Sequence, residues 1–440
     1  MQWTSITGRY LLESGLNTTD RAVRKIDPVH IERGLNFFFI RHRGKSSFTC
    51  LIPNIKEMNI KMNNYPGYAK IIFALTILAM SFFASAQKVH IGKVNVGLAY
   101  PISTNGTHAA ADTNYFSLNL IAGVSAAERG FSFAGISSVV KNDVKGMMFA
   151  GFSNHVGKGA EGMMFAGFIN SYAEAKGMQF AGFSNISKGK VSGAQFSGFL
   201  SKATDIQGAQ LAGFANVARD VTGPQFAGFS NVSRKIVGSQ FSGFINTAED
   251  VKGSQFAGFI NVARKVSGVQ AAGFINVADS SDYPLGIINI IRNGEKAIGI
   301  SVDENETGLL SFRSGGKVLY GIIAAGYNFH NKEEVYAFEA GLGAHFLNTS
   351  VFRMNAEITT QTLESFKQGE YFKSSVRLMP SLRPVPGLEL FGGPVFNYVN
   401  TNTSEGRAIT DKYIRTWENR WGNNFEGIYI GFNAGINFLF

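Results

Sequence analysis

The sequence predicts an all-β protein that combines a β-solenoid of about ten 15-residue coils with an antiparallel, outer-membrane-type β-barrel of about eight strands. Two observations lead to this prediction. A glycine-rich phrase recurs at a nearly fixed spacing over residues 128–294, and short-period self-similarity is typical of stacked supersecondary units. Segments on both sides of this array alternate apolar residues with small or polar ones, as strands that cross a membrane do.

Residues 58–86 are predicted to be a secretory signal peptide. A flank that contains lysine precedes a largely apolar run at 71–83, and the small residues at 84–86 form a cleavage motif. The apolar run is too short to be a spanning helix. The mature chain is therefore expected to begin near Gln87 and to be exported to the outer membrane.

Residues 1–57 are interpreted as a non-native upstream leader, because translation from Met58 or Met62 would place the signal at the N-terminus. The first 86 positions hold 11 of the 41 Lys and Arg residues and 5 of the 31 Asp and Glu residues, so the mature chain keeps 30 and 26 and a net charge of +4. Nucleic acid is therefore not expected as a partner. The only cysteine, Cys50, also lies upstream, which leaves the mature chain no disulfide and no thiol nucleophile.

Residues 87–127 and 295–440 are predicted to supply the barrel strands. Period-two alternation marks eight segments, an even number that is sufficient to close a small barrel: 93–101, 115–125, 318–328, 336–346, 352–358, 371–381, 387–398 and 428–440. The last segment ends on Phe440 and resembles the terminal strand of Gram-negative outer-membrane barrels, in which a final aromatic residue serves as an assembly signal. An ordinary half-buried strand is the alternative.

Loop lengths give an expectation for the side of the membrane. Long and short connections alternate between the predicted strands, and outer-membrane barrels have short periplasmic turns. If the N-terminus is periplasmic, the array is also periplasmic. A single uncounted strand within 291–316 would reverse this assignment.

The array at 128–294 repeats the phrase G-x-Q-F-A-G-F-x-N-V-A-x-x-V-x. A helix is disfavoured, because each of the two glycines in a copy would cost about 1 kcal/mol in a helix interior. Barrel strands remain an alternative, although the copies do not alternate strictly. A solenoid with one copy per coil is favoured. After a degenerate copy at Gly130, the copies begin at Gly146, Gly162, Gly177, Gly193, Gly208, Gly223, Gly238, Gly253 and Gly268.

The repeat predicts which side chains face the interior of the coil. A bend at Gly243 is expected to turn the phenylalanines on either side of it inward. The third-position Gln and ninth-position Asn residues are expected to form ladders between coils, and the charges at the twelfth and thirteenth positions, such as Lys235, an outward turn. Pro284 is expected to stop strand addition at an open end of the solenoid. The apolar positions in one copy are Phe241, Phe244, Thr247 (usually Val) and Val251.

No pattern in the mature sequence predicts an enzyme, a metal site or a cofactor. The common nucleotide, serine-hydrolase and zinc-protease motifs are absent. Asp303-x-Asn305-x-Thr307-Gly308 is similar to the start of a calcium loop, but Ser314 stands where a glutamate is needed. A turn between two strands explains this motif equally well. The histidines lack the spacing of metal ligands; they are His90, His108, His155, His330 and His345.

An aromatic and basic cluster in the loop at 399–427 is the candidate interaction patch. If this loop is extracellular, the cluster could bind a sugar or another surface, and the alternative is an interfacial aromatic belt. The candidate residues are Tyr413, Arg415, Trp417, Arg420 and Trp421.

The repeat G-x-Q-F-A-G-F-x-N, followed by Y-P-L-G-I-I-N-I-I-R-N-G at 283–294, resembles a bacterial surface-repeat family of envelope proteins with tandem G-x-Q-x-x-G-x-x-N units. The resemblance covers about 146–294 and implies an envelope location, with no activity or site. We therefore expect a non-enzymatic outer-membrane protein with a structural or interaction role, whose partners are outer-membrane lipid and an unknown envelope or surface component. The alternative is a porin-like channel built partly from the repeats.

Overall fold

The computed structural model describes residues 40–42, 45–47, 94–332, 335–366, 370–418 and 424–440. The chain divides into two compact units, 1–86 and 87–440. In the first unit, the described part is an antiparallel pair of strands, β1 (Ile40–His42) and β2 (Lys45–Ser47). The predicted signal peptide lies outside the described residues. The second unit is all-β and contains a parallel β-solenoid of about twelve turns and a closed eight-stranded antiparallel barrel.

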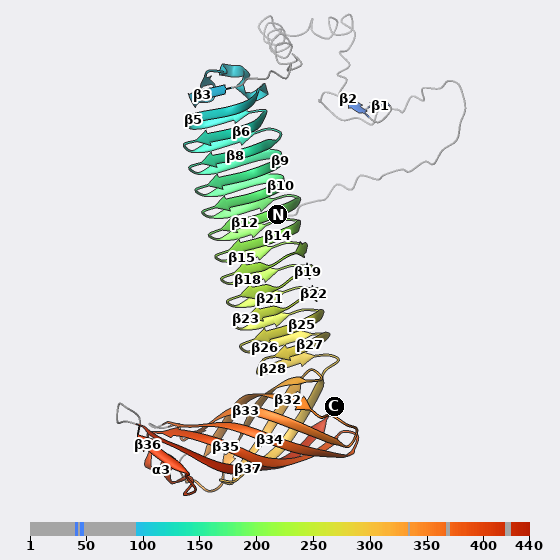
Figure 1. Cartoon of the computed structure of the whole chain (residues 1–440), viewed down its shortest axis with the longest axis vertical. Helices are drawn as coiled ribbons and strands as arrows, with labels where there is room; N and C mark the ends of the chain where they lie inside the picture. The colour runs from blue at the N-terminus through green and yellow to red at the C-terminus, as the bar shows by residue number, and fades with distance from the viewer. Residues whose placement is uncertain (1–39, 43–44, 48–93, 333–334, 367–369, 419–423) are drawn as a thin grey trace, which may run out of the picture. The chain divides into compact units, whose positions relative to one another are not determined.

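The solenoid starts with longer strands and continues with a regular series of short ones (Figure 1). Its elements are β3 (Val94–Ala99), β4 (Ile102–Ser103), the 3-10 helix η1 (Gly106–Ala111), β5 (Thr113–Ser125), β6 (Ala127–Ala134), β7 (Ser137–Val140), β8 (Val144–Ala150), β9 (Ser153–Ala166), β10 (Ile169–Ala181), β11 (Ser184–Ser187), β12 (Lys190–Ser197), β13 (Leu200–Lys202), β14 (Asp205–Ala212), β15 (Ala215–Val217), β16 (Asp220–Thr222), β17 (Gln225–Ala227), β18 (Ser230–Val232), β19 (Lys235–Val237), β20 (Gln240–Ser242), β21 (Ile245–Thr247), β22 (Asp250–Lys252), β23 (Gln255–Ala257), β24 (Ile260–Val262), β25 (Lys265–Ala272), β26 (Ile275–Ala278), β27 (Ser280–Leu285) and β28 (Ile288–Ile291).

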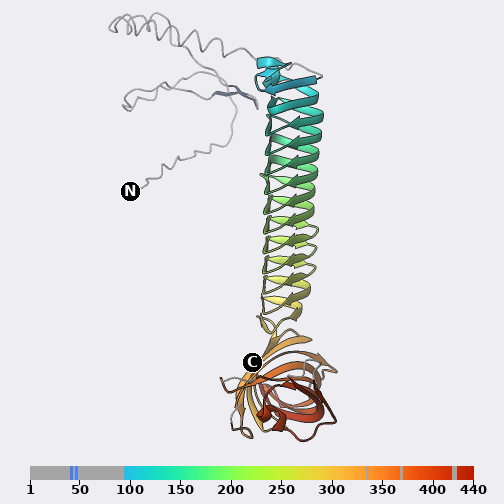
Figure 2. The ribbon, with the colours of Figure 1, turned by 90° about the vertical axis from the view of Figure 1, so that its left-hand side faces the viewer.

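Each coil pairs in parallel with the next, and equivalent repeat positions face each other. For example, β17 pairs with β20 so that Gln225 lies opposite Gln240 and Phe226 opposite Phe241. Figure 2 shows the successive coils stacked one on another along a single column. The solenoid prediction is confirmed, and the helical and barrel-strand interpretations of the repeats are wrong.

The prediction that 93–101 and 115–125 are barrel strands is wrong. β3 pairs in parallel with β5, and β5 pairs in parallel with β6, so both segments belong to the first coils of the solenoid. Period-two alternation shows only that a strand has two unlike faces, and it does not distinguish a parallel coil from an antiparallel barrel. Here Ser117 and Asn119 are buried and Leu118 is exposed, so the polar face is the inner one.

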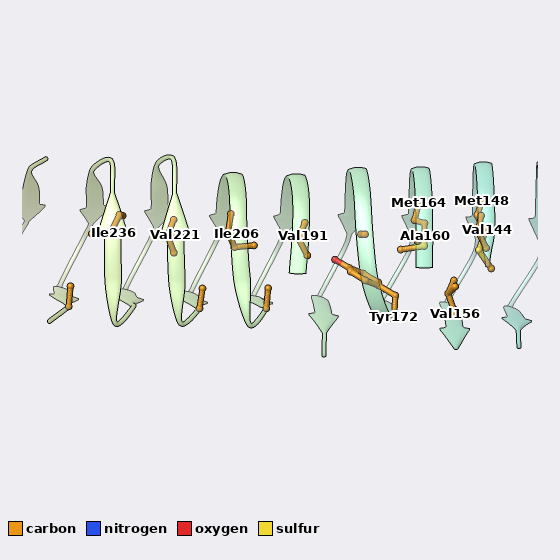
Figure 3. Close-up of a cluster of buried hydrophobic side chains, with 14 of the residues drawn as sticks. Val144, Met148, Val156, Ala160, Met164, Tyr172, Val191, Ile206, Val221 and Ile236 are labelled. Carbon is orange, nitrogen blue, oxygen red and sulfur yellow. The ribbon is translucent and has the colours of Figure 1, made fainter. Parts of the chain in front are cut away.

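The interior of the solenoid contains amide ladders and a row of aliphatic side chains. Gln225 Nε2 donates to Gln210 Oε1 at 2.7 Å, and Asn231 Nδ2 donates to Asn246 Oδ1 at 2.9 Å. Both predicted ladders are therefore confirmed. The fourteenth position, or the fifteenth in the 16-residue copy that contains Val191, supplies a buried aliphatic residue in successive coils (Figure 3), including Val191, Ile206, Val221 and Ile236.

The charged twelfth and thirteenth positions form the predicted outward turn. Arg234 Nη2 lies 2.6 Å from Asp220 Oδ2 in the preceding coil, and Arg219 Nη2 lies 2.9 Å from Asp205 Oδ2. These pairs repeat from coil to coil on the exposed turn. Because solvent screens exposed ion pairs, each pair is expected to contribute little to stability.

The barrel is built entirely from residues that follow the array. Strands β29 to β35 pair in chain order, and β37 pairs with both β35 and β29 and so closes the barrel. The predicted number of eight is confirmed, but β29 and β30 take the places of the two N-terminal segments. The elements are β29 (Glu295–Asp303), β30 (Thr307–Gly315), β31 (Leu319–Asn328), β32 (Tyr336–Phe346), β33 (Phe352–Glu364), β34 (Tyr371–Val385), β35 (Leu388–Thr401), α3 (Ser404–Ala408), β36 (Arg415–Glu418) and β37 (Phe425–Leu439).

The last coil meets the barrel directly, so Pro284 does not stop an open solenoid end. Pro284 pairs with Gln270 inside β27, and β28 continues the coil beyond it. The Asn289 N–H donates to Ser314 Oγ at 3.0 Å, and Asn289 Nδ2 donates to the Ser314 carbonyl at 3.1 Å. The Asn ladder therefore ends on the barrel strand β30. This strand covers the end of the solenoid, which the sequence had suggested would be open.

Candidate functional site

The residues of the predicted loop patch do not share one environment, because Tyr413 is packed against other rings and Arg415 and Trp417 are exposed. The Tyr413 ring packs 5.2 Å from that of Phe425 and 5.8 Å from that of Tyr429, measured between centroids. Burial raises the pKa of Tyr413 to about 12. Arg415 and Trp417 lie on β36 and are exposed. Trp417 Nε1 donates to Glu426 Oε2 at 2.5 Å.

Arg420 and Trp421 lie outside the described residues. Of the remaining three patch residues, Tyr413 is committed to barrel packing. The described part of the patch is therefore reduced to Arg415 and Trp417, which is too little to define a sugar-binding surface.

The calcium-like motif forms a turn between β29 and β30. Asp303 Oδ1 accepts hydrogen bonds from the backbone N–H groups of Asn305 at 3.0 Å and Thr307 at 2.9 Å. Asp303 Oδ2 lies 2.5 Å from Lys373 Nζ, so an ammonium already neutralises this carboxylate. Among the described residues, no group of three or more His, Cys, Asp and Glu side chains could hold a metal ion.

Both phenylalanines of the repeat face outward, so the prediction that a glycine bend turns them inward is wrong. In β17, Gln225 and Ala227 are buried and Phe226 between them is 40% exposed. Side chains of adjacent strand residues alternate, so an inward Gln and Ala require an outward Phe. Phe229, beyond the glycine, is also 40% exposed. The predicted Gln ladder at the third position was the signal that could have corrected this, because an inward Gln requires an outward Phe beside it.

The exposed phenylalanines form two stacked ladders along the solenoid. The seventh-position ladder is unbroken over nine coils, and its ring centroids lie 4.7 to 5.3 Å apart. The fourth-position ladder has similar spacing, and Leu211 and Ala271 replace Phe in two coils. Exposed apolar surface that continues over many residues marks a site of interaction.

A groove of about 1580 Å³ runs along the fourth-position ladder. The ladder lines it together with the small residues at the fifth and sixth repeat positions, such as Ala227 and Gly228. No lining side chain is charged, and the polar lining side chains are Ser197, Ser242, Thr359 and Thr360. The seventh-position ladder does not line this groove.

The backbone beneath the groove has its hydrogen bonds satisfied within the solenoid. The Gly228 N–H donates to the Ala212 carbonyl at 3.2 Å, and the Phe229 N–H donates to the Phe214 carbonyl at 3.0 Å. The same bonds recur in neighbouring coils. The groove therefore offers an occupant apolar contact and few hydrogen-bonding groups.

The barrel has a charged interior and an apolar exterior. Arg377 Nη1 donates to Glu339 Oε1 at 2.8 Å, and Arg313 Nε donates to Glu357 Oε1 at 3.1 Å. All four of these side chains are buried. Outward-facing residues include Ile300, Leu310, Ile358, Ile430 and Phe432, which are 53 to 66% exposed.

The barrel interior leaves little open space at the end where β29 begins and β37 ends. The cavity there has a volume of about 10 Å³ and lies among Arg313, Tyr320, His345 and Arg353. This is the size of about one water molecule. No helix in the described part of the chain is long and apolar enough to span a membrane.

The first coils contain a buried carboxylate, Glu128. Its oxygens accept hydrogen bonds from Ser117 Oγ at 2.9 Å and Asn114 Nδ2 at 3.2 Å. Burial raises the pKa of Glu128, although these hydrogen bonds oppose the shift. Because the folded-state pKa is the higher one, the contribution of Glu128 to stability is fully present below its unfolded pKa and is lost as the pH rises through the folded pKa.

We therefore expect Glu128→Gln to unfold at a higher urea concentration than the wild type at pH 7 and to lose this advantage at pH 4. The control is Glu161→Gln. Lys145 and Lys176 lower the pKa of this exposed carboxylate, so its small contribution is lost as the pH falls. Urea titrations of both variants at the two pH values measure the effect. An advantage of Glu128→Gln at pH 4 as large as that at pH 7 would contradict the expectation.

No family model matches the chain, and the searches of curated proteins and of solved structures also found no match.

Proposed function

We propose that this chain is a non-enzymatic outer-membrane protein whose barrel anchors it in the bilayer and whose solenoid is an interaction surface in the periplasm. The arrangement of side chains in the barrel, with charged groups inside and apolar groups outside, is the observation that carries this proposal. Ion pairs such as Arg377–Glu339 lie inside, while Ile300, Ile358 and Ile430 project outward. An apolar outer band on a closed antiparallel barrel suits a hydrocarbon environment, because closure leaves no unpaired strand edge in lipid.

Two sequence features support the same location. The predicted signal peptide at 58–86 would export the chain. The last strand, β37, alternates apolar residues with small or polar ones, as strands of outer-membrane barrels do. Its 15 residues are sufficient to cross a bilayer as a tilted strand.

Connection lengths support the periplasmic side for the solenoid. Because the barrel has eight strands, β29 begins on the side where β37 ends. The turns on this side are short, at 316–318, 347–351 and 386–387. Three of the four connections on the other side are longer, at 329–335, 365–370 and 402–424, and short turns are typical of the periplasmic side.

The porin-like alternative has less support. The repeats contribute no strand to the described barrel, so a pore would have to pass through the eight-stranded barrel itself. Inward side chains fill the interior of barrels of this size. The buried pairs of Arg313, Glu339, Glu357 and Arg377 lie across that path.

A protease-cleavable epitope tag inserted at the charged turn beside Lys235 tests the proposal in a Gram-negative host. We expect the tagged chain to be found in the outer-membrane fraction and to release the tag to added protease only after the cells are permeabilised. The control carries the same tag in the loop at 402–414, and we expect cleavage there in intact cells. Cleavage at Lys235 in intact cells would place the solenoid outside, and recovery in the soluble fraction would contradict anchoring.

A further inference from the structure

We propose that the groove along the fourth-position ladder binds the hydrocarbon chains of lipids, which enter it from the outward wall of the barrel. The inference rests on the proposed anchoring of the barrel in the membrane, and it assigns a ligand class to the solenoid surface.

The chemistry of the groove favours hydrocarbon over polypeptide. An extended peptide would bring backbone N–H and C=O groups that lose water on binding, and each such group needs a partner. The groove offers few partners, because its floor amides already donate to the preceding coil, as Gly228 does to the Ala212 carbonyl at 3.2 Å. A polymethylene chain needs none and gains free energy from apolar burial against the phenylalanine rings.

The groove is continuous with the outward wall of the barrel, and lipid chains could enter the groove from this wall. Beyond the last repeats, the groove is lined by Leu285 and Ile287 of the solenoid and by Leu342 and Ile358 of β32 and β33. Leu342 is 37% and Ile358 is 66% exposed. These two barrel side chains belong to the apolar outer band, so the groove joins a surface that would contact acyl chains in the bilayer.

The repeat makes this surface apolar along its length. Phe149, Phe165 and Phe180 present the same ring at the same position, and Phe226, Phe241 and Phe256 repeat it nearer the barrel. At about 4.8 Å per coil, the eight coils from Phe149 to Phe256 extend the ladder over roughly 34 Å. A repeating apolar track, in which Leu211 and Ala271 replace Phe, suits a flexible chain of methylene groups, because the chain meets apolar side chains in every register.

The two ladders provide a matched pair of variants. Phe226→Gln, Phe241→Gln and Phe256→Gln together remove rings that line the groove. Phe229→Gln, Phe244→Gln and Phe259→Gln together remove three exposed, stacked rings that do not line it. Loss of ladder stacking affects both triple variants, so a difference between them reports on the groove.

The experiment uses the full mature chain in lipid nanodiscs with a long-chain fatty acid that carries a diazirine. After illumination, mass spectrometry locates the labelled residues. We expect label on the outer band of the barrel and on the fourth-position coils as far as Phe149. We expect the amount of label on the coils to fall roughly tenfold in the groove variant, the change that follows from about 1.4 kcal/mol of lost binding energy. We expect the control variant to keep its coil label.

The possible results separate the two proposals. Label on the barrel without label on the coils would overturn lipid binding and leave anchoring intact. Absence of label on the barrel would overturn the anchoring and, with it, the proposed route into the groove. An equal loss of coil label in both triple variants would also overturn lipid binding.

Discussion

Arg377→Met is expected to destabilise the folded barrel by roughly 3–5 kcal/mol, because it leaves the buried carboxylate of Glu339 without its cation. Both terminal nitrogens of Arg377 pair with Glu339, and Nη1 lies 3.6 Å from Glu357 Oε2. All three side chains are buried. The measurement is the urea concentration at which the detergent-solubilised barrel unfolds, followed by its heat-modifiable migration in electrophoresis.

The double variant Arg377→Met with Glu339→Met is the control. It removes both members of the closest pair, and such replacements by apolar residues of similar size are often neutral. Glu357 keeps Arg313 as a partner at 3.1 Å. We expect the double variant to recover most of the lost stability. A double variant as unstable as Arg377→Met would show that the two side chains do not act as a pair.

The repeat period made the solenoid predictable, because each coil places the same residue over its copy. The Gln and Asn ladders follow directly from this register, and the structure confirms both of them. The final alternating strand was equally predictable, because period-two alternation defines a strand with two unlike faces. β37 is that strand.

The orientation of the phenylalanines was predicted wrongly, because apolar residues were expected to fill the interior. The inner positions of each coil hold Gln225, Ala227 and Asn231 instead, since amides that hydrogen-bond along the column can be buried at little cost. With the phenylalanines expected inside, the sequence did not predict the groove. β29 and β30 were not counted among the barrel strands, although the turn between two strands, the alternative to a calcium loop for the motif at 303–308, is the turn that joins them.

Gly223→Ala is expected to destabilise the solenoid by roughly 3 kcal/mol or more, because strain and a steric clash occur at one position. Gly223 has a φ of 130°, which side chains other than glycine rarely adopt. A Cβ there would lie 2.0 Å from the Gly208 carbonyl oxygen in the preceding coil, and backbone atoms cannot move aside as a flexible side chain can. The two coils would have to separate locally.

The position of the damage gives the sharper test. In a stacked repeat, each coil contacts only its neighbours, so stability is the sum of coil and interface terms. We expect hydrogen exchange to accelerate for the amides of the coils that contain Gly208 and Gly223, while the coils near Phe149 keep their protection. Thr222→Ala, one residue away and exposed, is the control that should leave exchange unchanged. If the hydrogen-exchange rates of Gly223→Ala matched those of the control, the spacing of the coils would not depend on the absence of a Cβ at this position. If protection were lost along the whole column, the coils would unfold as one cooperative unit, and the nearest-neighbour description would be wrong for this solenoid.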